Sequence, residues 1–209
     1  MKNKNLGMLA GILILIVFIL VSYFLQTNME FFEKNLDLGI FGIFLYVFIT
    51  VFATVVAPIS AIPLLPVAVF LWGWFYAAIL SVIAWTIGSV IAFIIARKYG
   101  ISIIKKFISL DKISYYESFI PKKDLFLGII LMRIFLPVDL LSYLLGIFSK
   151  VNLRTFTLAT FIGVIPFAII LSYVGSLPIL YQLVSLVFGG IVFLYLYYRF
   201  SKRLNMSSN

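Results

Sequence analysis

Three prolines interrupt the longest uncharged run of the chain, in the segment Pro58-Ile-Ser-Ala-Ile-Pro63-Leu-Leu-Pro66. The run extends from Leu38 to Ala96, and its 59 residues are too few for three helical spans of roughly 20 residues each. Because proline blocks helix continuation, a helix that enters this run must break at the prolines. Broken backbone at membrane depth is tolerated only when it is buried in protein or lines a wet cavity. Segment 38–72 therefore either crosses and turns back or forms a re-entrant hairpin, before a full span at 75–96.

The composition excludes a water-soluble globule. Of 209 residues, 64% are hydrophobic and only 11% are charged, and the mean hydropathy is +1.20, whereas about one-quarter of the residues in a soluble domain are charged. Cysteine and histidine are both absent, which excludes disulfides, thiolate zinc sites and Ser-His mechanisms. The acids are scattered singly, without paired carboxylates along any span, so we expect neither an enzyme nor a metal or cofactor site.

The placement of the basic residues distinguishes the two alternatives for segment 38–72. The net charge is +9, and the bases gather in short clusters between apolar runs, which is typical of the cytoplasmic ends of membrane spans. Lys2 and Lys4 place the start of the N-terminal helix in the cytoplasm. Only a re-entrant segment 38–72 then returns the seven bases between residues 97 and 123 to that side. The charge pattern therefore predicts the re-entrant hairpin.

The second half of the chain repeats this arrangement. Segment 125–149 is apolar but contains Arg133, Pro137 and Asp139, so a plain span would carry two buried charges and a helix break. We predict a second re-entrant hairpin there, which enters and leaves on the cytoplasmic side and precedes a full span at 153–174. The predicted fold is all-α and polytopic: an inverted repeat of two re-entrant helical hairpins, each followed by a transmembrane helix, with N- and C-terminal spans.

The predicted domain organisation has three parts, with both termini in the cytoplasm. They are an N-terminal anchor with an outer loop (1–37), a core with both hairpins (38–176) and a C-terminal transmembrane helix with a basic tail (177–209). Within the core, segment Ile101–Ser109 has an apolar side and a basic, hydroxyl-bearing side. Such a segment is predicted to lie flat in the headgroup layer.

Arg133 and Asp139 are the two charges predicted to lie inside the membrane. Such residues usually face a cavity and mark a substrate path, and a guanidinium holds a phosphate with two parallel hydrogen bonds. Arg133 is therefore expected to contact an anionic headgroup, or else to snorkel to cytoplasmic phosphates without a further role. Asp139 either caps the returning helix and pairs with Arg133, or exchanges a proton when phosphate displaces it from Arg133.

Two stretches of the core carry family signatures. The first is Phe93-Ile-Ile-Ala-Arg97-Lys-Tyr99-Gly100 after Gly88-Ser89, and the second is Arg133-Ile-Phe-Leu-Pro137-Val-Asp139-Leu-Leu-Ser142-Tyr143-Leu-Leu-Gly146, followed by Phe156, Gly163, Pro166, Tyr173 and Gly175. They resemble the signatures of the DedA/VTT-domain superfamily, also called SNARE-associated Golgi proteins. The resemblance covers about residues 38–176, and its second half is the more specific. The chain departs from classical members in having no acid in the first hairpin, and from relatives of this branch in having one proline near Arg133 where two are common.

The resemblance implies two facing re-entrant hairpins and movement of lipids between leaflets, of undecaprenyl phosphate in bacteria or of phospholipids in eukaryotes. The expected function is therefore a flippase or scramblase for a phosphate-headed lipid such as polyprenyl phosphate or phospholipid. The alternative is a membrane-protein insertase or assembly factor with a polar intramembrane groove. We expect an integral protein of the bacterial cytoplasmic membrane, with anionic or phosphate-headed membrane lipids as partners. A second copy of the chain is a further candidate partner, and nucleic acid is not expected.

The candidate site combines the two signatures with the broken hairpins. The candidate substrate-binding residues are Arg97, Arg133, Pro137, Asp139, Ser142 and Tyr143, with Pro63 and Pro66 of the first hairpin. Six glycines are expected to have structural roles: Gly73, Gly88, Gly100, Gly146, Gly163 and Gly175.

Overall fold

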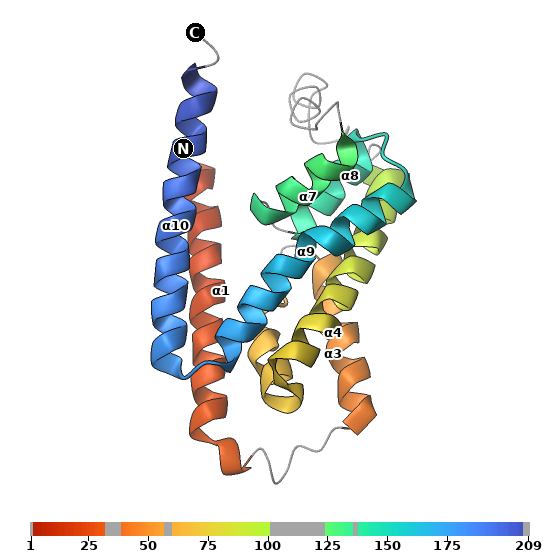
Figure 1. Ribbon diagram of the computed structural model, residues 1–209. Helices are drawn as coiled ribbons and strands as arrows, with labels where there is room; N and C mark the ends of the chain where they lie inside the picture. The colour runs from red at the N-terminus through yellow and green to blue at the C-terminus, as the bar shows by residue number, and fades with distance from the viewer. Residues whose placement is uncertain (1, 32–38, 57–59, 101–123, 136–137, 207–209) are drawn as a thin grey trace.

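The computed structural model describes residues 2–31, 39–56, 60–100, 124–135 and 138–206, with side chains at 9, 11–31, 39–56, 60–100, 124–133 and 141–192. Every regular element in these ranges is helical (Figure 1). The elements are α1 (Lys2–Thr27), α3 (Gly39–Val55), the 3-10 helix η1 (Ile62–Leu64), α4 (Leu65–Ile95), the π-helix η2 (Ala96–Gly100), α7 (Leu125–Phe135), α8 (Val138–Phe148), α9 (Leu153–Ser176) and α10 (Ile179–Met206). Pro58, Pro137 and segment 101–109 lie outside the described residues.

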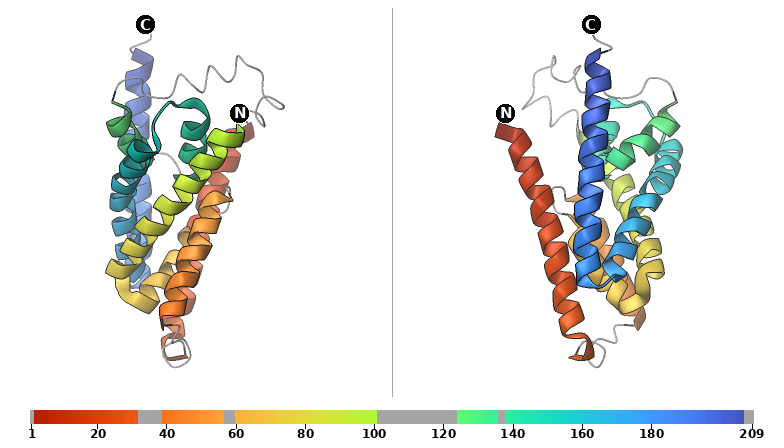
Figure 2. Two further views of the ribbon diagram at one scale, coloured as in Figure 1. Left: turned by 90° about the vertical axis from the view of Figure 1, so that its right-hand side faces the viewer. Right: turned by 60° about the vertical axis from the view of Figure 1, so that its left-hand side comes forward.

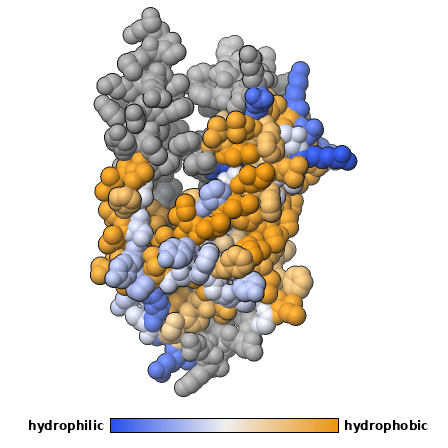
Figure 3. Space-filling view, viewed as in Figure 1, coloured by the Kyte–Doolittle hydropathy of each residue, from blue (hydrophilic) through white to orange (hydrophobic). Residues whose placement is uncertain are grey.

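The described helices have the length and surface of a membrane protein. Two stretches, Ile62–Gly100 and Leu153–Ser176, are long and apolar enough to cross a bilayer, and three shorter helical stretches are also apolar. Large apolar side chains cover much of the visible face (Figure 3). On α3, for example, Ile40 and Phe41 are 74% and 70% exposed, which is expected where lipid rather than water surrounds the helix. The prediction of an all-helical fold is confirmed for the described residues, and two of their helical stretches are candidate membrane spans.

The first run breaks at the prolines, as the sequence predicts. Helix α3 ends at Val55, and Pro63 and Pro66 lie in the first turns of η1 and α4, where the missing backbone N–H of proline costs little. A second break lies within α4 at Gly73, whose backbone has φ 75° and ψ 162°. Only glycine adopts this conformation readily. The long helix therefore changes direction at Gly73, close to the predicted start of the full span.

Helix α9 packs most extensively against α4, and α3 also packs along α4. Helices α7 and α8 lie toward the upper end of the molecule, together with the first residues of α1 and the last residues of α10 (Figures 1 and 2). The turn in α4 lies toward the opposite end. The α7–α8 pair and the turn in α4 therefore lie toward opposite ends of the α4–α9 pair.

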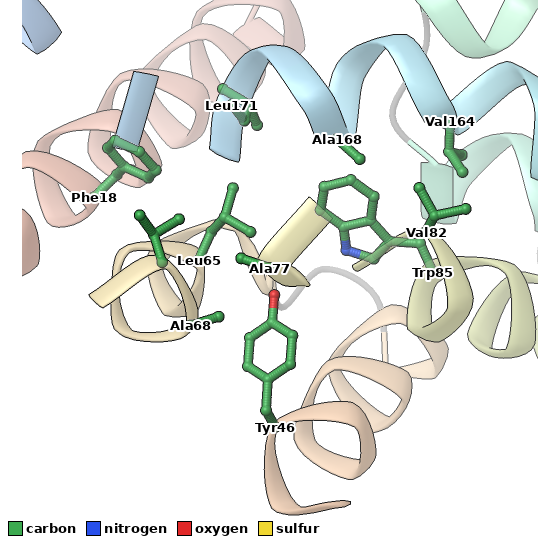
Figure 4. Close-up of a cluster of buried hydrophobic side chains, with 11 residues drawn as sticks. Phe18, Tyr46, Leu65, Ala68, Ala77, Val82, Trp85, Val164, Ala168 and Leu171 are labelled. Atoms are coloured by element: carbon green, nitrogen blue, oxygen red, sulfur yellow. The ribbon is translucent and has the colours of Figure 1, made fainter. Parts of the chain in front are cut away.

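Two clusters of buried apolar side chains stabilise this arrangement. The first joins α1, α3, α4 and α9 (Figure 4) and contains Phe18, Tyr46, Leu65, Ala68, Val69, Ala77, Val82, Trp85, Val164, Ala168 and Leu171. The second lies where α7 and α8 meet α4 and α9, and contains Phe93, Ile129, Leu141, Leu145, Val151, Phe156 and Ala159. The second cluster surrounds the principal candidate site.

Candidate functional site

Arg133 is buried at the junction of three helices. It lies in the last turn of α7, and only 4% of it is exposed. Its Nη2 donates to the Ser142 Oγ of α8 at 3.1 Å and to the Thr160 Oγ1 of α9 at 2.9 Å. Both hydroxyl-bearing residues are 0% exposed. Two hydroxyl groups from different helices therefore orient this guanidinium inside the protein.

Gly163 allows α7 to approach α9 at this junction. A Cβ at position 163 would lie 2.9 Å from the Arg133 Cβ and 3.0 Å from its Cγ. Real Cβ atoms essentially never show the first separation, and the second is tighter than nine in ten real contacts, so a side chain there would displace Arg133. The expected structural role of Gly163 has a clear physical cause.

Aromatic rings lie beside the buried guanidinium. The Arg133 Cζ lies over the Phe156 ring, 5.4 Å from its centroid. Phe156 in turn stacks on Phe93, with centroids 4.1 Å apart and planes 17° apart. Arginine favours such positions over aromatic faces. The site is therefore a charged group held between hydroxyls and rings.

The Arg97 side chain bonds to backbone carbonyl oxygens of α8 and of the segment that follows it. Its Nε, Nη2 and Nη1 donate to the carbonyl oxygens of Gly146 at 3.4 Å, Ser149 at 2.7 Å and Val151 at 2.6 Å. The Arg97 Cζ also lies 4.2 Å from the centroid of the Phe93 ring. Carbonyls at the end of a helix lack intrahelical partners. Arg97, a predicted substrate-binding residue, therefore holds the end of α8 and the turn after it against η2.

Tyr143 connects the two predicted hairpins. Its hydroxyl, from α8, donates to the carbonyl oxygen of Val55, the last residue of α3. That carbonyl is one of the orphaned acceptors at a helix end. The place where α3 breaks and the helix that follows Arg133 are therefore in direct contact.

Three further glycines permit close helix contacts. A Cβ on Gly146 would lie 2.6 Å from the Phe93 carbonyl oxygen, one on Gly100 would lie 2.5 Å from Ile147 Cγ1, and one on Gly88 would lie 2.6 Å from Thr54 Cβ. Gly175 differs, because its nearest neighbours would be at 3.4 and 3.5 Å, which is ordinary packing distance.

The remaining predicted site residues divide into two groups. Pro63 and Pro66 start η1 and α4 in the other half of the protein, where η1 packs against α1. Pro137 and the side chain of Asp139 lie outside the described residues, although the Asp139 backbone belongs to the first turn of α8. Of the predicted site residues, the structure therefore brings Arg133 and Ser142 into contact. Tyr143 directly follows Ser142 in the sequence.

Sequence reasoning missed Thr160. The available signal was its position on the buried face of α9, between Phe156 and Gly163 at helical spacing. Within the described residues, no group of three or more acidic, cysteine or histidine side chains could hold a metal ion. The chemistry that this site offers is the binding of an anion by a guanidinium and hydroxyl groups.

Comparisons with known proteins identify the family. The family model described as the VTT domain matches residues 58–177, a stretch that contains α4, α7, α8 and α9 with Arg133, Ser142 and Thr160. No curated protein and no solved structure matches the chain. The match covers more than half of the sequence, and it agrees with the signatures around Arg97 and Arg133. The chain belongs to the VTT-domain family, which is the DedA/SNARE-associated Golgi protein family.

Proposed function

We propose that this protein moves a phosphate-headed lipid, such as polyprenyl phosphate or phospholipid, between the leaflets of a bacterial cytoplasmic membrane. The observation that carries the proposal is the burial of Arg133, at 4% exposure, in a membrane protein whose sequence is 64% hydrophobic. A charge inside a membrane protein is costly, and residues of this kind generally mark the path of a substrate or ion. Phosphate is the anion that a guanidinium binds with the best geometry.

The hydrogen bonds of Arg133 support a headgroup site over snorkelling. A snorkelling arginine extends its guanidinium to the interface, whereas Arg133 directs Nη2 to Ser142 and Thr160 inside the protein. These hydroxyls can also donate to a phosphate oxygen that enters the site. Arg133, Ser142 and Thr160 therefore form the proposed headgroup site.

The proposed transport requires two re-entrant hairpins that face each other. Helices α7 and α8 have 11 residues each, and roughly 16 Å of helix cannot cross a hydrocarbon layer of about 30 Å. Helix α3 ends where Tyr143 contacts Val55. Both features support an inverted pair of hairpins whose tips meet near mid-membrane, where transporters of inverted-repeat architecture bind substrate.

The proposed orientation places both termini in the cytoplasm. The first residues of α1, the last residues of α10 and the α7–α8 pair lie toward the same end of the molecule (Figure 1). Lys2, Lys4 and the bases of the C-terminal tail, among them Arg199 and Arg203, belong to this end. Basic segments favour the cytoplasmic side. The headgroup site at Arg133 is then closer to the cytoplasmic leaflet.

The test is leaflet exchange by purified protein in liposomes, with a fluorescent phospholipid and a polyprenyl phosphate measured separately. Replacement of Arg133 by lysine keeps the charge but removes the planar fork, so Arg133→Lys is expected to slow exchange of the transported lipid roughly tenfold. Arg154→Lys is the matched control, because Arg154 is exposed in the first turn of α9. Equal exchange in Arg133→Lys and in wild type would contradict the proposal. If depletion of the protein from cells leaves leaflet lipid exchange intact but lowers the abundance of particular membrane proteins, the result would favour an insertase.

A further inference from the structure

A column of four side chains connects the Arg133 site to the end of α4. Arg97 lies 4.2 Å from the Phe93 centroid, Phe93 stacks on Phe156 at 4.1 Å, and Arg133 lies 5.4 Å from the Phe156 centroid. Phe93 and Phe156 are 1% and 0% exposed. Each buried ring therefore contacts one arginine and the other ring.

We propose that Phe156 and Phe93 are positioning residues of the Arg133 site, and that Arg97 fixes the outer end of their stack. They set the affinity for the phosphate headgroup through Arg133, without contacting the lipid. This inference rests on the proposed lipid function. It also gives Arg97 a role different from direct substrate binding.

The physical argument begins with the freedom of an arginine side chain. Several rotatable bonds separate the guanidinium from its backbone, and holding it in one place costs side-chain entropy. The Ser142 and Thr160 hydroxyls restrain one nitrogen, Nη2. A ring beneath the Cζ restrains the guanidinium as a whole, because guanidinium groups favour stacking on aromatic faces. Phe156 thus supplies a restraint that the two hydrogen bonds lack.

The outer end of the column is fixed by backbone contacts. Arg97 donates to three carbonyl oxygens, those of Gly146, Ser149 and Val151. The Gly146 backbone in turn packs so closely on Phe93 that a Cβ would lie 2.6 Å from the Phe93 carbonyl oxygen. Movement of Phe93 would therefore disturb the packing of α8 on α4. The stack rests on this fixed end.

A simple packing role makes a different prediction from a positioning role. Leucine fills most of the volume of phenylalanine and keeps an apolar core, but it offers no aromatic face to a guanidinium. The variant Phe156→Leu therefore separates the two roles. A control on the same helix is Phe167→Leu, because Phe167 is 40% exposed on α9 and its ring centroid lies 5.9 Å from that of Trp85.

The first experiment does not depend on lipid transport. Purified wild type, Phe156→Leu and Phe167→Leu are treated with phenylglyoxal, and modification of Arg133 is followed by mass spectrometry, with exposed Arg154 as internal reference. A guanidinium released from its ring should react roughly tenfold faster in Phe156→Leu. Phe167→Leu should match wild type. Phe93→Leu, which removes the second ring, replaces Phe156→Leu if that variant does not fold.

The second experiment measures exchange of polyprenyl phosphate at increasing mole fractions. The half-saturating mole fraction should rise roughly fivefold in Phe156→Leu, with the maximal rate nearly unchanged. In an Arg133→Lys background, Phe156→Leu should cause no further loss, because it acts through Arg133. Unchanged Arg133 labelling, or losses that add in the double variant, would overturn the positioning role. If instead Arg133→Lys leaves exchange unchanged, the proposed function fails, while the labelling result still decides whether the rings position Arg133.

Discussion

The two halves of the core bury different polar groups in similar surroundings. In the first half, formed by α3, η1 and α4, the Tyr46 hydroxyl lies 2.7 Å from the Ser81 Oγ, and Ser81 donates to the Ala77 carbonyl at 2.7 Å. In the second half, formed by α7, α8 and α9, the buried group is Arg133 with its two hydroxyl partners. The first pair is neutral and bonds within its own half.

The difference indicates a division of roles. No residue between Leu38 and Ala96 is charged, so the first half has no group that could bind an anion by charge. A neutral hydrogen-bonded pair mainly fixes the packing of α3 on α4. The second half buries a guanidinium, which can bind an anion by both charge and hydrogen bonds. We therefore expect lipid chemistry to depend on the second half and scaffold stability to depend on both.

The largest expected effect comes from Gly146→Ala. The added methyl group would lie 2.6 Å from the Phe93 carbonyl oxygen and 2.7 Å from the Ala96 Cβ, and neither neighbour can move without shifting a helix. Overpacking of this kind is expected to lower the stability by about 3 kcal/mol. Thermal unfolding in detergent measures the change.

Gly175→Ala is the matched control for this prediction. The nearest neighbours of its added methyl, in Val69 and Phe18 of the first cluster, lie at 3.4 and 3.5 Å. The unfolding temperature of that variant should stay close to wild type. If both glycine variants unfold alike, the tight contact of α8 with α4 is not a distinctive feature of the second half.

The next effect compares two buried threonines. Thr160 accepts a hydrogen bond from Arg133 at 2.9 Å, whereas Thr54 donates to the Thr50 carbonyl of its own helix at 2.9 Å. Thr160→Val removes a partner of a charged group, so we expect a loss of roughly 2 kcal/mol in stability and slower lipid exchange. Thr54→Val should change both by little, because a hydroxyl bond within one helix contributes little to stability.

Thermal unfolding and liposome exchange of both threonine variants check this comparison. Equal exchange defects in Thr160→Val and Thr54→Val would show that the two halves contribute alike to transport. A loss of stability in Thr160→Val without slower exchange would assign Arg133 to folding alone.

The sequence predicted those features of the fold that arise from local chemistry. Proline at positions 63 and 66 and the uncharged run around them predicted the break that follows Val55. Gly73 was predicted to be structural, and its positive φ gives the reason. The family signatures also placed Ser142 near Arg133. In each case the cause lies within a few residues of the effect.

The sequence could not predict contacts that depend on the packing of distant helices. Thr160 lies 27 residues from Arg133, and in sequence it looks the same as Thr157, whose hydroxyl donates to the Leu153 carbonyl of its own helix. The acceptors of Arg97 are backbone carbonyls, which every residue has. A buried arginine therefore predicts that partners exist, but not which helix supplies them.

The smallest expected effect concerns the contact between the halves. The Tyr143 hydroxyl donates to the Val55 carbonyl, across the proposed meeting point of the hairpins, whereas the Tyr46 hydroxyl bonds to Ser81 within the first half. Tyr143→Phe removes one neutral hydrogen bond, so the stability should fall by only about 1 kcal/mol. Tyr46→Phe should cost a similar amount, although Ser81 keeps its bond to the Ala77 carbonyl.

The two tyrosine variants should differ in lipid exchange rather than in stability. If the hairpin tips must stay together for a headgroup to pass between them, Tyr143→Phe slows exchange while Tyr46→Phe does not, at matched unfolding temperatures. Exchange of polyprenyl phosphate in liposomes, with both proteins reconstituted at equal density, measures the difference. Slower exchange in Tyr46→Phe alone would reverse the assignment of lipid transport to the second half. Transport would then depend on the neutral Tyr46–Ser81 pair of the first half, and the charge at Arg133 would no longer distinguish the half that handles the lipid.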